Sequence, residues 1–141
     1  MIWVIDSSVA VRWFLKTERH PHADAVMEQV VRQTDQFMAP ELFAFEVYAV
    51  LCRLHPKGSE VFVEGVMPLL EGGILRQPMT GNLARQASFY VEKGLTGYDA
   101  CYAALAKEIG GLWLTFDGKA HRCIENFRVS LNLMEGLPEN W

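Results

Sequence analysis

Four acidic residues have the types and positions from which a metal-dependent reaction could be built: Asp6, Glu46, Asp99 and Asp117. Taken singly, each aspartate has an ordinary role near a helix N-terminus, whereas a glutamate in an apolar stretch needs a partner. If the four carboxylates meet, each pair ~4 Å apart repels by roughly 4 kcal/mol at an effective dielectric constant near 20. Hard divalent cations relieve this repulsion, and ligation by oxygen alone suits Mg²⁺ or Mn²⁺.

Such a site would support phosphodiester hydrolysis. Two cations ~3.5–4 Å apart can activate a water molecule and stabilise the leaving oxygen. Histidine and cysteine do not figure in the cluster, which disfavours zinc. We expect the hydroxyl residues Ser7, Thr96 and Thr115 to support the acids, because hydroxyl groups can hydrogen-bond ligand carboxylates or metal-bound water.

The segment from Thr96 to Asp117 shows how the chain could position two of the acids. Thr96 is a good helix N-cap, and Asp99 follows three residues later, as in a capping box. The sequence predicts a helix that ends at Gly110-Gly111, and then a short buried strand over Leu112–Leu114. In a parallel α/β sheet, the start of a helix and the end of a strand can face one crevice.

The rest of the chain alternates between the two kinds of element. Further strands are expected at Trp3–Ile5, Phe37–Pro40, Ile74–Gln77 and Val129–Leu133. Further helices are expected at about Ser8–Leu15, Ala23–Arg32, Glu41–Leu54, Ser59–Glu71, Gly81–Lys93 and Lys119–Glu125, with a tail from Gly136 to Trp141. This alternation predicts an α/β fold with a mainly parallel sheet. The helix that carries Glu46 is apolar nearly all round, so we expect it to be buried or covered by a partner.

Composition limits the class of protein. A chain of 141 residues, half of them hydrophobic, predicts one domain with a real core, and no apolar run approaches the roughly 20 residues of a membrane helix. The N-terminus lacks the features of a signal peptide. The three cysteines form no Cys-x-x-Cys pair, so we expect core positions in a reducing cytosol. A net charge of −4 argues against a general electrostatic nucleic-acid binder, although bound cations can reverse the local sign.

Four ordered motifs resemble the PIN domain, and most closely its VapC-type toxin ribonucleases. They are Val4–Val9, Pro40–Leu42 with Phe45–Val47, Thr96–Ala100 with Tyr102–Ala106, and Leu114–Asp117. The resemblance covers essentially the whole chain. It implies a single three-layer PIN-like domain over residues 1–141, with a central, mainly parallel sheet of about five strands flanked by helices. It also implies Mg²⁺- or Mn²⁺-dependent RNA cleavage, a homodimer, a VapB-type antitoxin partner and a cytoplasmic location.

The resemblance also implies a role for each acid. Asp6 and Asp99 would be direct metal ligands, and Asp117 would serve the metal centre directly or through water. Glu46 would orient a water molecule or complete the ligand shell. All four residues are then catalytic.

Other functions remain open at this stage. A PIN-like module could bind protein without catalysis. A receiver-like phosphate-accepting domain would need paired acids after the first strand, where Asp6 is followed by Ser7 and Ser8. A haloacid-dehalogenase-like phosphatase would need Asp-x-Asp there, and position 8 is serine.

Overall fold

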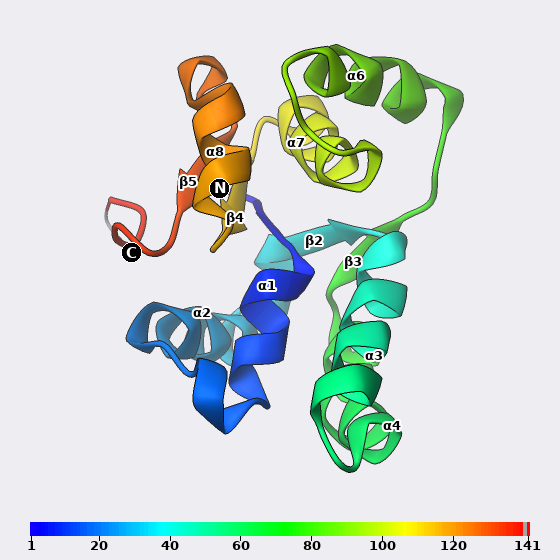
Figure 1. Cartoon of the computed structure of the whole chain (residues 1–141), viewed down its shortest axis with the longest axis vertical. Helices are drawn as coiled ribbons and strands as arrows, with labels where there is room; N and C mark the ends of the chain where they lie inside the picture. The colour runs from blue at the N-terminus through cyan, green and yellow to red at the C-terminus, as the bar shows by residue number, and fades with distance from the viewer. Residues whose placement is uncertain (140) are drawn as a thin grey trace.

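The computed structural model describes residues 1–139 and Trp141. Five strands form one parallel sheet in the order β3-β2-β1-β4-β5 (Figure 1). The strands are β1 (Trp3–Ile5), β2 (Phe37–Pro40), β3 (Leu75–Gln77), β4 (Leu112–Thr115) and β5 (Ser130–Asn132). The predicted fold class is confirmed, and each described strand pairing is parallel.

The strand order reverses between β1 and β4. The chain passes from β1 outward to β2 and β3, then returns to place β4 on the other side of β1. Ile5 pairs with Leu114, so Asp6 and Thr115 follow at the same edge of the sheet. Ligands of parallel α/β sheets bind outside the carboxyl ends of the strands at such a reversal point.

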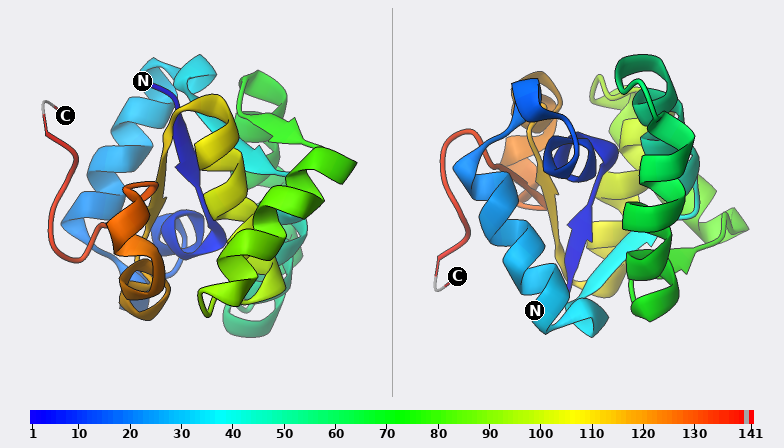
Figure 2. Two further views of the ribbon diagram at one scale, coloured as in Figure 1. Left: turned by 90° about the horizontal axis from the view of Figure 1, so that it is seen from above. Right: turned by 90° about the horizontal axis from the view of Figure 1, so that it is seen from below.

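Helices cover both faces of the sheet. They are α1 (Ser7–Ala10), α2 (Pro21–Arg32), α3 (Leu42–Leu54), α4 (Gly58–Val61), α5 (Met67–Gly72), α6 (Gly81–Glu92), α7 (Gly97–Ile109) and α8 (Gly118–Ile124). Figure 2 shows α2 on one side of β1 and helices α3 and α7 on the other. Helix α7 packs across β1, β2 and β4, which gives the three-layer arrangement.

Three predicted helices differ from the structure by more than a single residue at one end. The first helix ends at Ala10 and continues as the 3₁₀ turn η1 (Val11–Trp13), short of Leu15. Helix α2 begins two residues earlier than expected, because Pro21 suits the first helical turn and His20 caps it. The helix predicted over Ser59–Glu71 contains a π segment. Proline lacks an N–H, and Pro68 at the start of α5 therefore interrupts the regular hydrogen-bond pattern.

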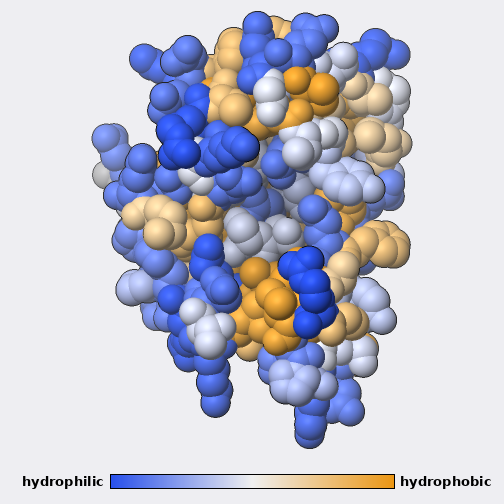
Figure 3. All heavy atoms as spheres, in the orientation of Figure 1, coloured by the Kyte–Doolittle hydropathy of each residue, from blue (hydrophilic) through white to orange (hydrophobic). Residues whose placement is uncertain are grey.

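Helix α3 is exposed on one side, so the chain itself does not bury it all round, and cover by a partner stays a prediction. Its buried residues are Phe43, Val47 and Leu51, at helical spacing. Phe45 is 75% exposed and Tyr48 is 45% exposed. On the face shown in Figure 3, hydrophobic patches alternate with hydrophilic areas.

The cysteines and the C-terminal tail complete the comparison with the sequence. Cys101 is buried as predicted, but Cys52 and Cys123 are exposed. Residues 136–138 form neither helix nor strand, and Trp141 packs its ring 5.4 Å from that of Trp3. The remaining tail residue, Asn140, lies outside the described residues. In the described part of the chain, no helix is both long and apolar enough to cross a membrane.

Gly111 lies between the end of α7 and the start of β4. Because it has no side chain, its backbone can approach the chain at the start of β1 closely. A Cβ atom there would lie 2.3 Å from the carbonyl oxygen of Ile2. That oxygen also accepts a hydrogen bond of 3.2 Å from the Leu112 amide. We expect Gly111→Ala to cost about 1–3 kcal/mol, as overpacking does, and to lower the melting temperature by several degrees.

Thermal melting followed by circular dichroism checks this prediction. Gly72→Ala is the matched control, because a Cβ atom there would meet nothing within 4 Å. Melting of Gly111→Ala at the wild-type temperature would contradict the close approach of the two strands.

Candidate functional site

Asp6 follows β1 directly and is held by donors from two parts of the chain. Its Oδ1 accepts hydrogen bonds from the backbone amide of Ser8, at 3.0 Å, and from the Ser8 hydroxyl. Its Oδ2 accepts a bond of 3.0 Å from Nε1 of Trp113 on β4. Burial raises the pKa of Asp6 to about 6, and the charge of Asp99 adds to the rise, although the Ser8, Thr115 and Trp113 donors oppose it.

Asp117 lies two residues beyond β4, at the same edge of the sheet. It caps α8, because its Oδ1 accepts a bond of 3.0 Å from the Ala120 amide. Its own amide donates to Oγ1 of Thr115 at 3.0 Å. The Thr115 oxygen lies 3.5 Å from Oγ of Ser8, which also accepts a bond of 3.0 Å from the Phe116 amide. The turns that follow β1 and β4 are therefore joined by hydroxyl groups.

Asp99 occupies the first turn of α7 and lies among the other acids. The predicted cap is present, because Oγ1 of Thr96 accepts a bond of 3.1 Å from the Asp99 amide. Burial raises the pKa of Asp99, the charge of Asp117 raises it further, and the Thr96 hydroxyl lowers it. Asp99 in turn raises the pKa values of Asp6 and Glu46.

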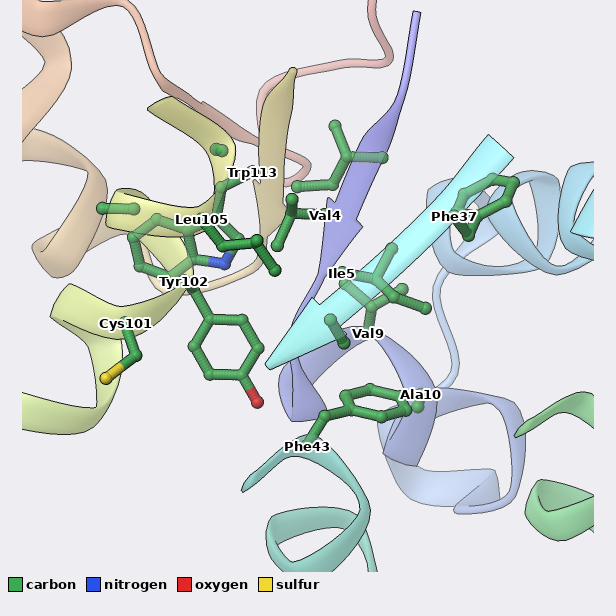
Figure 4. Close-up of a cluster of buried hydrophobic side chains, with 14 of the residues drawn as sticks. Val4, Ile5, Val9, Ala10, Phe37, Phe43, Cys101, Tyr102, Leu105 and Trp113 are labelled. Atoms are coloured by element: carbon green, nitrogen blue, oxygen red, sulfur yellow. The ribbon is translucent and has the colours of Figure 1, made fainter. Parts of the chain in front are cut away.

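Glu46 projects from α3 and is held by an aromatic residue of α7. The hydroxyl of Tyr102 donates to Oε1 of Glu46 at 2.6 Å. The Tyr102 ring stacks on Trp113, with centroids 5.9 Å apart and planes 16° apart. Figure 4 shows the Tyr102 hydroxyl directed toward the side of the cluster where Phe43 lies. Burial raises the pKa of Glu46, with Asp99 adding to the rise and the Tyr102 hydrogen bond lowering it.

In the structure Asp99 lies near enough to each of the other three predicted acids for their charges to interact, and three residues that sequence reasoning missed support the site. The hydroxyl that reaches Asp6 belongs to Ser8, not to the predicted Ser7, because the residue two positions after an N-cap donates to it. Trp113 and Tyr102 were also missed as supports. The available signal was that a buried tryptophan or tyrosine needs a partner for its polar tip.

The four acids supply oxygen atoms of the kind that a divalent cation binds, but their present placement does not form a metal site. In the stretch 1–139 and at Trp141, no three Asp, Glu, His or Cys side chains lie close enough, as placed, to hold one ion. The acids nevertheless fit a hard divalent cation in kind. They are oxygen donors, and an ionised carboxylate has about four lone-pair sites. Burial and the repulsion between neighbouring acids raise the pKa values of Asp6, Glu46 and Asp99. Binding would require side-chain rotation or bridging water.

The fold agrees with the comparisons with known proteins. The sequence profile of the PIN domain matches residues 3–124, so the chain belongs to the PIN domain family. PIN domains are generally nucleases. A comparison with curated proteins finds no match.

Solved structures with the same fold include three bacterial or archaeal proteins. PAE2754 from Pyrobaculum aerophilum is 18% identical, with a TM-score of 0.67 over 96% of this chain and 92% of the other. FitAcB from Neisseria gonorrhoeae is 17% identical, with a TM-score of 0.68 over 93% and 97%. VapC20 from Mycobacterium tuberculosis, a toxin that cleaves the sarcin-ricin loop, is 16% identical, with a TM-score of 0.63 over 85% and 93%.

Replacing Asp99 should stabilise the metal-free protein at neutral pH. Its pKa in the folded state is raised, so wild-type stability falls as pH rises from the unfolded value through the folded one. Asparagine carries no charge and avoids this loss. We expect Asp99→Asn to melt a few degrees above wild type near pH 8 in a chelator, and the difference to vanish toward pH 4.

Melting curves from about pH 4 to about pH 8 test this expectation. Asp35→Asn serves as the control, because Asp35 is an exposed acid just before β2, at the edge of the sheet opposite to the one where Asp6 and Asp117 lie. If Asp99→Asn melts below wild type at every pH, Asp99 stabilises the helix start, and its ionised form does not destabilise the folded state.

Proposed function

We propose that this protein is a divalent-metal-dependent endoribonuclease that cleaves RNA phosphodiester bonds, and that it acts as the toxin of a VapBC-type toxin–antitoxin pair. One observation carries the proposal. Asp6 and Asp117 follow β1 and β4 at the strand-order reversal of the fold, and Asp99 lies near enough to Asp6, Glu46 and Asp117 for their charges to interact. Family membership supports the nuclease class.

The acids divide the work according to their surroundings. Asp6 and Asp99 would hold Mg²⁺ or Mn²⁺ directly, and Asp117 would hold it directly or through water. The bound cations would supply Lewis acidity and charge neutralisation for phosphodiester hydrolysis. The Thr115 and Ser8 hydroxyls fix the turns that carry Asp6 and Asp117, so they preset the spacing of these two acids.

Glu46 is suited to orienting a water molecule. Tyr102 fixes one carboxylate oxygen by its hydrogen bond, and lone pairs of the carboxylate remain for a water. The raised pKa of Glu46 brings its protonation nearer to neutral pH, where a group that accepts a proton works best. The stack of Tyr102 on Trp113 restrains the tyrosine, and through it the glutamate.

The partners follow from the same assignment. We propose a VapB-type antitoxin, a homodimer, RNA as the substrate and a cytoplasmic location. The similarity in fold to VapC20, a toxin, supports the antitoxin partner. The exposed Phe45 and Tyr48 on α3 offer apolar surface for association. Cysteines that are free in the described structure agree with a reducing compartment.

One second candidate has an observation in its favour. Asp6 and Asp117 cap α1 and α8, so a PIN-like protein-binding module without catalysis would also retain them. The receiver-like and dehalogenase-like alternatives belong to other families, so membership of the PIN family removes their support.

Metal binding and cleavage should fail together in Asp99→Asn. A ligand at about 100 times its dissociation constant adds ~2.7 kcal/mol, which raises the melting temperature by several degrees in a domain of this size. We expect millimolar Mg²⁺ or Mn²⁺ to give this shift and to support RNA cleavage in wild type and Asp35→Asn. Asp99→Asn should show neither response. Wild-type protein that shows no metal shift and no cleavage of RNA would favour the non-catalytic module.

Tyr102→Phe should move the pH dependence of cleavage. The variant keeps the ring but removes the donor that lowers the pKa of Glu46, so that pKa rises further. If Glu46 works as an ionised group, the acid side of the rate profile shifts to higher pH.

Glu46→Gln should lose about 10²-fold or more of the rate, with little change in melting. Wild-type cleavage by Glu46→Gln would remove this residue from the mechanism.

A further inference from the structure

A small pocket opens beside the acids, between the start of α3, the start of α7 and the loop after β3. It encloses about 150 Å³, and its apolar walls include Leu42, Met79, Tyr98 and Cys101. Tyr98 is 66% exposed and Met79 is 54% exposed. Pockets for drug-sized ligands enclose about 300–1,000 Å³, so this one suits a single flat ring system.

The pocket adjoins the acids through short spacings along two helices. Tyr98 directly precedes Asp99, and Leu42 lies one helical turn before Glu46 on the same side of α3. Cys101 lines the pocket and follows Asp99 by two residues on α7. Figure 4 shows the Cys101 sulfur directed away from the buried cluster. A ligand cleaved at the acids would therefore have its next group beside this pocket.

Polar groups at the pocket rim are fixed by the loop after β3. Oε1 of Glu41 accepts a bond of 3.3 Å from the Met79 amide. Nε2 of Gln77 donates to the Pro78 carbonyl at 3.1 Å. A carboxylate only accepts hydrogen bonds, so Glu41 suits a ring with an exocyclic amino group. Adenine, cytosine and guanine carry such a group, and uracil does not.

We propose that this pocket is a base-reading subsite that receives one unstacked base of single-stranded RNA next to the cleaved phosphate, with Tyr98 stacking on the base. The proposal rests on the proposed ribonuclease function. The occupant is a base because the pocket is mostly apolar, is lined by the aromatic residue Tyr98 and lies next in sequence to Asp99. Stacking on an aromatic ring also needs no positive charge, which suits a chain of net charge −4. The subsite would favour bases that carry an amino group over uracil.

The test is cleavage of a random-sequence single-stranded RNA pool with Mn²⁺, followed by sequencing of the cut ends. Wild type should show a base preference against uracil at one position beside the cut. Tyr98→Ala should weaken that preference and raise KM by about 5- to 150-fold, with a smaller effect on kcat. Tyr98→Phe keeps the stacking ring and should retain the preference. Met79→Trp fills the pocket and should remove the preference even though the protein stays folded.

Phe89→Ala is the matched control, because Phe89 is an exposed aromatic on α6 that does not line this pocket. A second measurement separates binding from chemistry. In the Asp99→Asn background without metal, Tyr98→Ala should weaken binding of the same RNA pool by a similar factor, and Phe89→Ala should not.

The outcomes distinguish the two proposals. Cleavage by wild type with unchanged preference and KM in Tyr98→Ala and Met79→Trp would overturn the subsite and leave the ribonuclease intact. Equal losses in Tyr98→Ala and Phe89→Ala would also overturn it, because stacking would then be unspecific. Absence of RNA cleavage by wild type would overturn both proposals, and a peptide or protein occupant would then replace the base.

Discussion

The carboxylate of Asp6 lies out of water at the end of β1, and much of the site depends on how this cost is met. A buried carboxylate is tolerated only when it is hydrogen-bonded. The donors come from Ser8 in the turn that follows and from Trp113 on the neighbouring strand. They require β1 and β4 to be adjacent and in register. The Trp113 ring then stacks on Tyr102, which holds Glu46. The buried Asp6 is thereby connected through Trp113 and Tyr102 to Glu46 on α3.

The alternation of short apolar runs and turn residues predicted the parallel fold, because these features mark strand ends locally. The segment from Thr96 to Asp117 was read almost as the structure has it. The supports around the acids could not be read in the same way. Whether Ser7 or Ser8 reaches Asp6 depends on the turn geometry, and the Tyr102–Glu46 bond joins residues 56 positions apart. The sequence could not decide whether α3 is buried by its own chain or left for a partner to cover, because composition alone does not show which neighbours a helix has.

Without cations, the acid cluster opposes folding. The pKa of Asp6 rises from 3.8 to about 6, so its ionised form costs the fold on the order of 3 kcal/mol at neutral pH. Asp99 and Glu46 carry costs of the same sign. Domains are stable by only about 5–15 kcal/mol. The cost of ionising the buried acids is therefore a large fraction of the stability of the fold. Functional sites commonly keep such unfavourable arrangements, and the surrounding core compensates for them.

The sheet ends on one side at β3, and that edge has a consequence for solubility. An unpaired outer strand offers backbone groups to any other extended chain and can seed aggregation. Here the strand is only three residues long, and Leu75 on it is 59% exposed. Arg76 places a charge in the middle of the strand, and Pro78 follows directly and cannot donate a backbone hydrogen bond. The short length of β3, its charge and the following proline all hinder pairing with a strand of another molecule. The chain can therefore expose apolar surface near the site without aggregating through this edge of its sheet.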